Sequence, residues 1–241
     1  MSIHGSGAGA AAHSPLHALQ RPSLAIDGRP DLFEVRRIYC VGRNYVAHIR
    51  EMKEGDERDP PFFFQKPTDA LVTDGRVPYP TCTDDLQYEV ELVVAIGATP
   101  KGASTDEALG AVFGYAVGLD MTRRDRQRES FRAGLPWEIG KSFDHSAPCG
   151  RLHPVSAVGH CLKGDMRLTV NGEERQSAQL EQMIWNVPEM IRELSGQYRL
   201  MPGDLIFSGT PAGVGPVGVG DRLEGVIAGL SPLRVEIVAP L

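Results

Sequence analysis

Hydrophobic residues occur along this chain in short runs, separated by polar turns rich in glycine and proline. Runs of this length, with many Val, Ile and aromatic residues, are typical of buried strands. Strands are therefore expected at 36–42, 62–66, 88–97, 112–119, 204–208, 221–228 and 233–238. A further run at 166–170 is followed by Asn171 and Gly172, a pair that favours the two-residue turn of a β-hairpin. The pattern predicts a mainly β chain with some helix, an α+β fold in one domain.

Few segments have the composition or periodicity of a helix. Helices are expected at 45–52, 105–109, 121–132 and 177–194. Asn44 is a suitable cap for the first of them, and Pro188 indicates either a kink or a late start in the last. The arginine-rich segment 123–128 also contains an acidic residue and is expected to be an exposed helix face. Residues 1–30 are expected to form a flexible N-terminal arm, and 31–241 the folded domain.

Composition and charge narrow the class of protein. The 241 residues carry a formal net charge of −6, which argues against nucleic acid or an anionic membrane as a partner. The longest apolar stretch, 92–98, is too short to cross a bilayer, and 1–14 lacks the pattern of a signal peptide. The cysteines form no C-x-x-C pair and are expected to be reduced thiols of a cytoplasmic protein: Cys40, Cys82, Cys149 and Cys161.

Two glutamates stand at the start of an otherwise hydrophobic strand. Glu89 and Glu91 are two residues apart, so their side chains point to the same face. Asp120 follows another hydrophobic run. Three carboxylates at buried strand ends would form an all-oxygen site suited to Mg²⁺, Mn²⁺ or Ca²⁺ rather than zinc. The alternative is an exposed strand end whose glutamates pair with arginines.

A histidine and a glutamate lie three residues apart in the expected helix at 45–52. His48 and Glu51 would share one face of this helix, where the carboxylate can orient the imidazole to deprotonate a water. The charged loop that follows, 53–59, would suit a mobile lid. The alternative is a solvated helix face that happens to contain a histidine.

Two more residues are candidates for binding an anionic ligand. Lys141 follows a glycine in a mildly apolar stretch and could stabilise a developing oxyanion; an ordinary surface lysine is the alternative. Thr210 opens a glycine-rich loop after a hydrophobic run, so its hydroxyl and backbone N–H could receive a carboxylate. A plain turn would explain Thr210 equally well.

Taken in order, these segments resemble the fumarylacetoacetate hydrolase family, in its short acylpyruvase-type branch. The resemblance covers residues 36–238 without large gaps, and its specificity comes from the ordered set rather than from one motif. The matching segments are 39–45, 48–52, 64–67, 88–92, 118–122, 135–137, 140–143 and 209–215.

The resemblance implies a catalytic domain over 31–241, built as a mixed β-sandwich or β-roll with a short lid helix, usually in a homodimer. It implies one Mg²⁺ or Mn²⁺ held by Glu89, Glu91 and Asp120. It assigns water activation to His48 with Glu51, and oxyanion stabilisation to Lys141. Substrate contacts are implied for Gln127 and Thr210. A further acidic ligand of larger family members has no counterpart that we can locate here.

The implied substrate is a 2,4-diketo acid, an acylpyruvate, hydrolysed to pyruvate and a carboxylic acid. Segments 61–67 and 137–141 are most similar to bacterial fumarylpyruvate hydrolases of aromatic-compound breakdown. A fumaryl group adds a second carboxylate, which could meet Arg43, Lys66 or an arginine of 123–128. One alternative is an oxaloacetate decarboxylase or a related 2-keto acid lyase or isomerase with the same metal site. Another is a non-enzymatic acidic β-domain that binds a small ligand.

Overall fold

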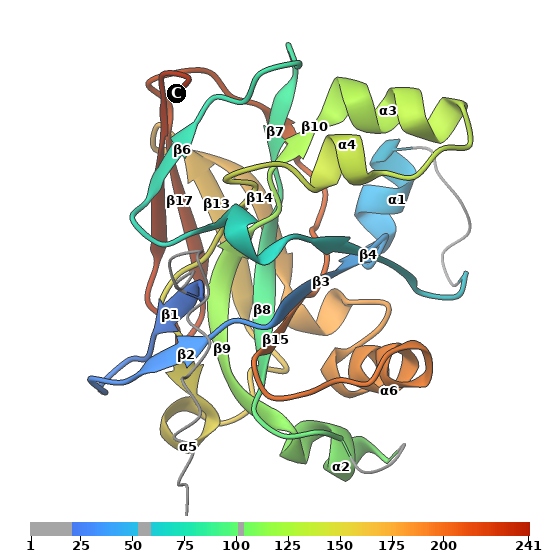
Figure 1. Cartoon of the computed structure of the whole chain (residues 1–241), viewed down its shortest axis with the longest axis vertical. Coiled ribbons are helices and arrows are strands. Elements are labelled where there is room, and N and C mark those ends of the chain that lie inside the picture. The colour runs from blue at the N-terminus through green and yellow to red at the C-terminus, as the bar shows by residue number, and fades with distance from the viewer. Residues whose placement is uncertain (1–20, 53–58, 101–103) are drawn as a thin grey trace, which may run out of the picture.

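The computed structural model describes residues 21–52, 59–100 and 104–241. Residues 1–20 of the expected arm and 53–58 of the expected lid loop lie outside this part of the chain. Within it, two sheets pack face to face and the helices lie to one side and at one end (Figure 1). The mainly β fold predicted from the sequence is confirmed.

The larger sheet has six strands in the order β12-β9-β8-β15-β3-β4. Its strands are β3 (Arg37–Gly42), β4 (Phe62–Lys66), β8 (Val90–Ile96), β9 (Val112–Leu119), β12 (His153–Pro154) and β15 (Asp204–Phe207). Every residue of β8 is buried, because both faces of this sheet are covered, which is why its sequence reads as a continuous hydrophobic run. Strand β4 is at the sheet edge with Phe62 40% exposed, so the expectation of a fully buried strand there was wrong.

The second sheet has the order β14-β13-β17-β18-β6. Its strands are β6 (Arg76–Pro78), β13 (Asp165–Val170), β14 (Glu173–Gln179), β17 (Arg222–Ile227) and β18 (Leu233–Val238). Here buried and more accessible residues alternate, because only one face packs on the larger sheet. Strands β13 and β14 form the hairpin predicted at Asn171 and Gly172, both of which have positive φ.

Three small sheets complete the strands. They are β1 (Ser23–Ala25) with β2 (Leu32–Glu34); β10 (Thr122–Arg123) with β7 (Leu86–Tyr88) and β16 (Gly215–Pro216); and β11 (Ala147–Pro148) with β5 (Leu71–Val72). Strand β1 lies within the expected flexible arm. Because Leu24 and Ile26 are buried in a hydrophobic cluster, residues 23–26 belong to the folded domain, and the boundary expected at 30 is too late.

The helices are α1 (Val46–Met52), α2 (Thr105–Gly110), α3 (Arg124–Arg132), α4 (Glu138–Lys141), α5 (Val155–Val158) and α6 (Val187–Gln197), with short 3₁₀ turns at Thr68–Ala70 and Leu180–Gln182. The helix expected at 177–194 starts ten residues late, at Val187. Asn186 caps it in a reciprocal hydrogen-bond pair with Glu189, and Pro188 stands in its first turn. None of the described helices is long and apolar enough to cross a membrane.

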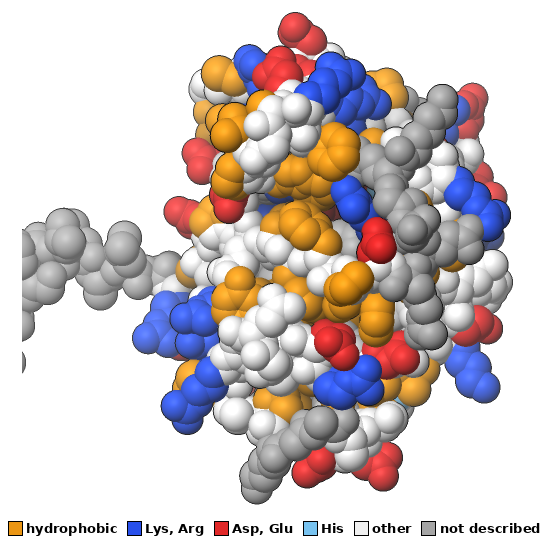
Figure 2. Space-filling view, turned by 90° about the vertical axis from the view of Figure 1, so that its right-hand side faces the viewer, with side chains coloured by type: hydrophobic (Ala, Val, Ile, Leu, Met, Phe, Trp, Pro, Cys, Tyr) orange, Lys and Arg blue, Asp and Glu red, His pale blue; other side chains and the backbone are white. Residues whose placement is uncertain are grey.

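Helices α1, α3 and α4 lie together on one side of the molecule, at the right of Figure 1. That face displays hydrophobic side chains among charged ones (Figure 2). Exposed hydrophobic residues here are Phe62 of β4, Phe131 of α3, Ile139 of α4, and Leu135 between these two helices. One pocket is lined by residues of α1, α3 and α4 and of strands β3, β4 and β8.

Candidate active site

Three acidic residues meet where β8 begins and β9 ends. The two strands are antiparallel, with Glu91 opposite Gly118, so the start of one lies beside the end of the other. Glu89 precedes β8, and its carbonyl accepts a hydrogen bond from the Asp120 backbone N–H at 2.9 Å. Carboxylate oxygens of Glu89, Glu91 and Asp120 all lie within 4.8 Å of one another, and all three residues are buried. The sheet register therefore produces the carboxylate cluster expected from the sequence.

Three buried cations contact this cluster through Glu89 and Asp120. The Lys141 ammonium lies 2.8 Å from Glu89, 2.8 Å from Asp120 and 2.7 Å from the Thr122 hydroxyl. The Arg124 guanidinium pairs with Glu89, and the Lys66 ammonium lies 2.8 Å from Asp120. Burial disfavours the charged form of Lys141, but Asp120 and Glu89 hold its pKa above the ordinary value. The surface-lysine alternative for Lys141 is therefore wrong.

The three carboxylates do not share these cations equally. Burial disfavours the charged form of Glu89, yet Lys141 and Arg124 hold its pKa below the ordinary value. Glu91 accepts a hydrogen bond from the Gly209 N–H at 2.8 Å. Burial, Asp120 and Glu89 together raise the pKa of Glu91 well above the ordinary value. A further cation beside Glu91 would relieve this repulsion, and the all-oxygen donor set fits a hard divalent ion.

The histidine and glutamate expected to act together do lie side by side. His48 Nδ1 is 3.3 Å from Glu51 Oε2, and the Gly213 N–H donates to Glu51 at 3.1 Å. Burial opposes ionisation of Glu51, but the hydrogen bonds from His48 and Gly213 hold its pKa below the ordinary value. Since Nδ1 faces Glu51, Nε2 is the nitrogen that can act on a ligand.

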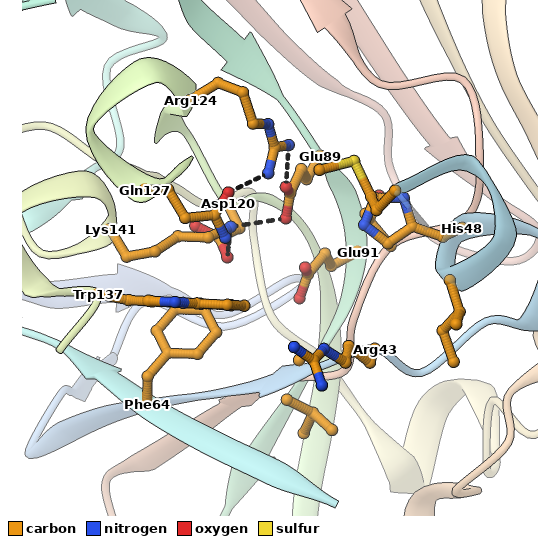
Figure 3. Close-up of a pocket in the computed structure, with 15 residues that line it drawn as sticks. Arg43, His48, Phe64, Glu89, Glu91, Asp120, Arg124, Gln127, Trp137 and Lys141 are labelled. Carbon is orange, nitrogen blue, oxygen red and sulfur yellow. Dashed lines mark hydrogen bonds and ion pairs between the residues drawn. The ribbon is translucent and has the colours of Figure 1, made fainter. Parts of the chain in front are cut away.

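The three carboxylates, Lys141, Arg124 and His48 line one pocket that is partly open to solvent. In Figure 3, Lys141 and Arg124 lie on one side of the carboxylates, and His48 lies on the other. The pocket is lined by Arg43, His48, Phe64, Glu89, Glu91, Asp120, Arg124, Gln127, Trp137, Lys141 and Thr210, together with Val41, Gly42, Ile49 and Met52.

The expected substrate contacts occupy different places. Gln127 accepts a hydrogen bond from Arg124. The Thr210 hydroxyl donates to the Val90 carbonyl at 2.9 Å. Arg43 stacks over Phe131 and Trp137 at the pocket, with its guanidinium carbon 5.8 Å and 6.0 Å from the ring centroids. Lys66 lies behind Asp120, outside the pocket lining, where its ammonium also donates to the Met121 carbonyl at 3.1 Å.

Comparison with known proteins identifies the family. The family model described as fumarylacetoacetate (FAA) hydrolase C-terminal matches residues 37–238. The chain belongs to the fumarylacetoacetate hydrolase family. A fumarylpyruvate hydrolase from a Ralstonia species is 42% identical over 177 residues, which cover 73% of this chain and 92% of that protein.

Other relatives in the family have a different activity. A mitochondrial oxaloacetate tautomerase from Pongo abelii is 39% identical over 206 residues, covering 85% of this chain and 93% of that protein. Among solved structures, the fumarylpyruvate hydrolase from Pseudomonas aeruginosa in complex with Mn²⁺ and pyruvate is 50% identical. It superposes with a TM-score of 0.90 and covers 94% of this chain and 100% of that chain. The family resemblance inferred from the ordered motifs is thus confirmed.

Sequence reasoning missed the position of Arg124 in this family site. The segment 123–128 was expected to be an exposed helix face, yet Arg124 is 1% exposed. Helix α3 starts where β10 ends, so its first residue is carried into the cluster beside Glu89. The available signal was its spacing from Gln127, because residues three apart share a helix face. Phe64 and Trp137 lie in the matching segments 64–67 and 135–137, but nothing in the local sequence indicates that both line the pocket.

Proposed function

We propose that this chain is a divalent-metal-dependent hydrolase that cleaves the C–C bond of an acylpyruvate to pyruvate and a carboxylic acid. The observation that carries the proposal is the His48–Glu51 pair placed across one pocket from three buried carboxylates. A binding module has no need of an oriented imidazole beside such a cluster. The relatives named fumarylpyruvate hydrolase support the same reaction class.

The metal site of the proposal consists of Glu89, Glu91 and Asp120, which would hold Mg²⁺ or Mn²⁺. When bound, the ion supplies Lewis-acid polarisation of the keto acid end of the substrate. Lys141, Lys66 and Arg124 balance the charge of the three carboxylates. Occupancy by a divalent ion therefore leaves the pocket net positive, which suits an anionic substrate.

His48 removes a proton from water through Nε2, while Glu51 holds Nδ1 and stabilises the imidazolium. Glu51 is itself held by the Gly213 N–H. The water oxygen bonds to C4 of the acylpyruvate, the C3–C4 bond breaks, and its electron pair goes to C3 of the pyruvate fragment, which takes up a proton. General-base catalysis of this kind contributes about 10²–10⁴-fold in rate.

The oxyanion at C4 is stabilised by the cations on the opposite side of the pocket. Lys141 acts through its charge, because its hydrogen bonds already go to Glu89, Asp120 and Thr122. Gln127 is held through its side-chain carbonyl by Arg124, so its NH₂ group is the donor left for substrate. Thr210 contacts the carboxylate at the pyruvate end of the substrate.

The acyl group of the proposed substrate is a flat chain that ends in a carboxylate, as in fumarylpyruvate. Phe64 and Trp137 provide aromatic surface in the pocket, and Arg43 stacks beside Trp137. A guanidinium suits a carboxylate because its N–H groups form paired hydrogen bonds. Lys66 was an equal candidate from the sequence, but its place behind Asp120 makes it a positioning cation for that carboxylate.

The assembly and cellular role remain part of the proposal. We infer a homodimer that uses Mg²⁺ in the cytoplasm, in the breakdown of aromatic compounds. The family resemblance supports the dimer, and the exposed hydrophobic residues of α3 and α4 offer a surface for it (Figure 2). All four cysteines are unpaired, as expected for a reducing compartment.

Activity measurements on fumarylpyruvate, acetylpyruvate and oxaloacetate, each with Mg²⁺ and with Mn²⁺, test the proposal. We expect hydrolysis of fumarylpyruvate to be the fastest. His48→Ala should lower kcat at least about 100-fold while leaving Mn²⁺ affinity unchanged. Decarboxylation of oxaloacetate needs no activated water and should tolerate His48→Ala. A variant that retains wild-type hydrolysis would refute the assignment of His48.

The oxaloacetate reaction is the second candidate function because of the tautomerase relatives. It would be favoured if oxaloacetate were consumed faster than both acylpyruvates. The dyad is an observation against decarboxylation, which needs no activated water. Tautomerisation would use the same dyad to move the proton at C3, so the substrate comparison is what distinguishes it from hydrolysis.

A further inference from the structure

A buried glutamine of the second sheet reaches the strand that carries the metal-binding glutamates. Gln176 lies on β14 and is 1% exposed, although its neighbours Arg175 and Ser177 are exposed. Amide side chains are mostly found on protein surfaces, and a buried one is retained where its hydrogen bonds are satisfied. Its contacts therefore show what the residue holds.

The Gln176 amide fixes the peptide between the two glutamates. Its Oε1 accepts a hydrogen bond from the Val90 N–H at 3.0 Å, and its Nε2 donates to the Thr210 hydroxyl at 2.9 Å. The Thr210 hydroxyl in turn donates to the Val90 carbonyl at 2.9 Å. Both backbone polar groups of Val90, the residue between Glu89 and Glu91, are thus held from one side.

The same amide fixes the loop 209–213. Nε2 of Gln176 also donates to the Pro211 carbonyl at 2.9 Å. Within this loop, the Gly209 N–H donates to Glu91 at 2.8 Å and the Gly213 N–H donates to Glu51 at 3.1 Å. One short loop therefore touches a carboxylate of the cluster at its first residue and the water-activating pair at its last.

The loop is also pressed closely against β14. A Cβ atom at Gly213 would lie 2.0 Å from the Arg175 carbonyl oxygen, and Gly213 has a φ of +99°. Side chains of ordinary residues fit neither condition. The loop is therefore fixed to β14 at two places: by hydrogen bonds from Gln176 to Thr210 and Pro211, and by the packing of Gly213 against Arg175.

We propose that Gln176 is a positioning residue that sets the carboxylate cluster and the His48–Glu51 pair in one fixed geometry. It holds Val90 and the loop 209–213 together, and these two segments carry the contacts to Glu91 and Glu51. The inference deepens the proposed function and rests on it for the identity of the bound ion and substrate. Residues that orient metal ligands typically change metal affinity or activity by about 10–100-fold when they are replaced.

Gln176→Met tests the proposal, because methionine has a similar length and removes all three hydrogen bonds. Isothermal titration with Mn²⁺ alone should give a Kd raised about tenfold or more. With fumarylpyruvate and saturating Mn²⁺, kcat should fall more than KM changes, because Glu51 is no longer held in place. Gln176→Glu keeps the acceptor for the Val90 N–H but loses both donated hydrogen bonds to the loop. Its Mn²⁺ Kd should therefore stay above the wild-type value and its kcat below it.

Leu168→Ala is the matched control, since Leu168 is fully buried and faces Gln176 in the β13–β14 register. It should lower the melting temperature while leaving the Mn²⁺ Kd of the folded protein unchanged. Equal Mn²⁺ Kd and kcat values for folded Gln176→Met and wild type would overturn the proposal. If Gln176→Met does not fold, Thr210→Val removes one hydroxyl from the same network and is judged by the Mn²⁺ Kd alone, because Thr210 is also a proposed substrate contact. An unchanged Kd would then overturn the proposal.

The two proposals can fail separately. A wild-type protein that binds Mn²⁺ but hydrolyses no acylpyruvate would refute the proposed function, and the Mn²⁺ Kd would still decide the role of Gln176. A wild-type protein that hydrolyses acylpyruvates, together with a Gln176→Met variant of unchanged Kd and kcat, would refute only the role of Gln176.

Discussion

At the scale of single residues, the site is a balance between buried charges. Glu89 lies against Lys141 and Arg124, and Asp120 lies against Lys141 and Lys66. Among the described residues, no ion pair is recorded for Glu91. Removing one partner of a buried ion pair leaves an uncompensated charge and is strongly destabilising, by about 3–5 kcal/mol. Glu89 and Glu91 are only two positions apart, but loss of their charges should therefore change the stability of the metal-free protein in opposite directions.

Glu91→Gln should leave the metal-free protein as stable as wild type or more stable, because it removes the carboxylate that is repelled by Glu89 and Asp120. Glu89→Gln should lower stability, because Lys141 and Arg124 lose a common partner. Both should weaken the rise in melting temperature that Mn²⁺ produces in wild type. Thermal melts in EDTA and in excess Mn²⁺ measure both effects. A metal-free Glu91→Gln protein less stable than Glu89→Gln would contradict this charge assignment.

At the scale of elements, the site depends on a loop and a short helix held by contacts far along the chain. Helix α1 has only 7 residues, too few for a helix to be stable on its own. Buried Ile49 anchors it, and Glu51 contacts Gly213 of the loop 209–213. The local sequence predicted both helix α1 and the contact between His48 and Glu51, because these two residues lie within one turn of the same helix. The loop contact joins residues 162 positions apart, and no local pattern encodes it.

Gly213→Ala should displace this loop, because the new methyl group would overlap the Arg175 carbonyl at a positive φ. We expect kcat to fall at least about tenfold through the loss of the Glu51 contact. Gly220→Ala is the control: Gly220 has a similar φ of +95°, but no atom lies within 4 Å of its Cβ position. It should cost some stability and leave kcat unchanged. Steady-state kinetics and thermal melts separate the two, and equal kcat values would show that the loop packing is unimportant.

At the scale of the whole molecule, two hydrophobic clusters flank the larger sheet, and each contains cysteine. Cys149 lies in the smaller cluster and Cys161 in the larger. Burial raises the pKa of Cys149 to about 12 and that of Cys161 to about 11. An unfolded cysteine loses its proton near pH 8.5. Between a pH of about 8.5 and the raised pKa of each thiol, the folded protein keeps a proton that the unfolded chain has lost.

The free energy of unfolding should therefore fall as the pH rises from about 8.5 toward 12, by at most about 1.4 kcal/mol per pH unit for each buried thiol. Cys149→Ala should make this decline shallower, whatever its effect on stability at pH 7. Cys82→Ala is the control, because Cys82 is exposed. Denaturant unfolding at pH 8, 9 and 10 measures the slope. An identical slope in wild type and Cys149→Ala would contradict the prediction.

The sequence by itself determined most strands, the Asn171–Gly172 hairpin, the carboxylate trio, the His48–Glu51 pair and the family. These features depend on side-chain alternation, turn chemistry and ordered motifs, which are written within a few residues of each other. The sequence pattern placed the last long helix too early, because Ala178 of β14 and Leu180 of the following 3₁₀ turn extend the helical spacing without continuing the helix.

Only the tertiary structure decided which of the charged and polar residues are buried together. Arg124 is buried rather than exposed, Lys66 lies behind the pocket, and Lys141 donates hydrogen bonds to the carboxylates of Glu89 and Asp120. Lys141 is 52 positions from Glu89, and Gln176 is 86 positions from Val90. Partners so distant are chosen by how the two sheets and helix α3 pack, since desolvation makes each buried polar group accept whichever partner the fold brings within reach.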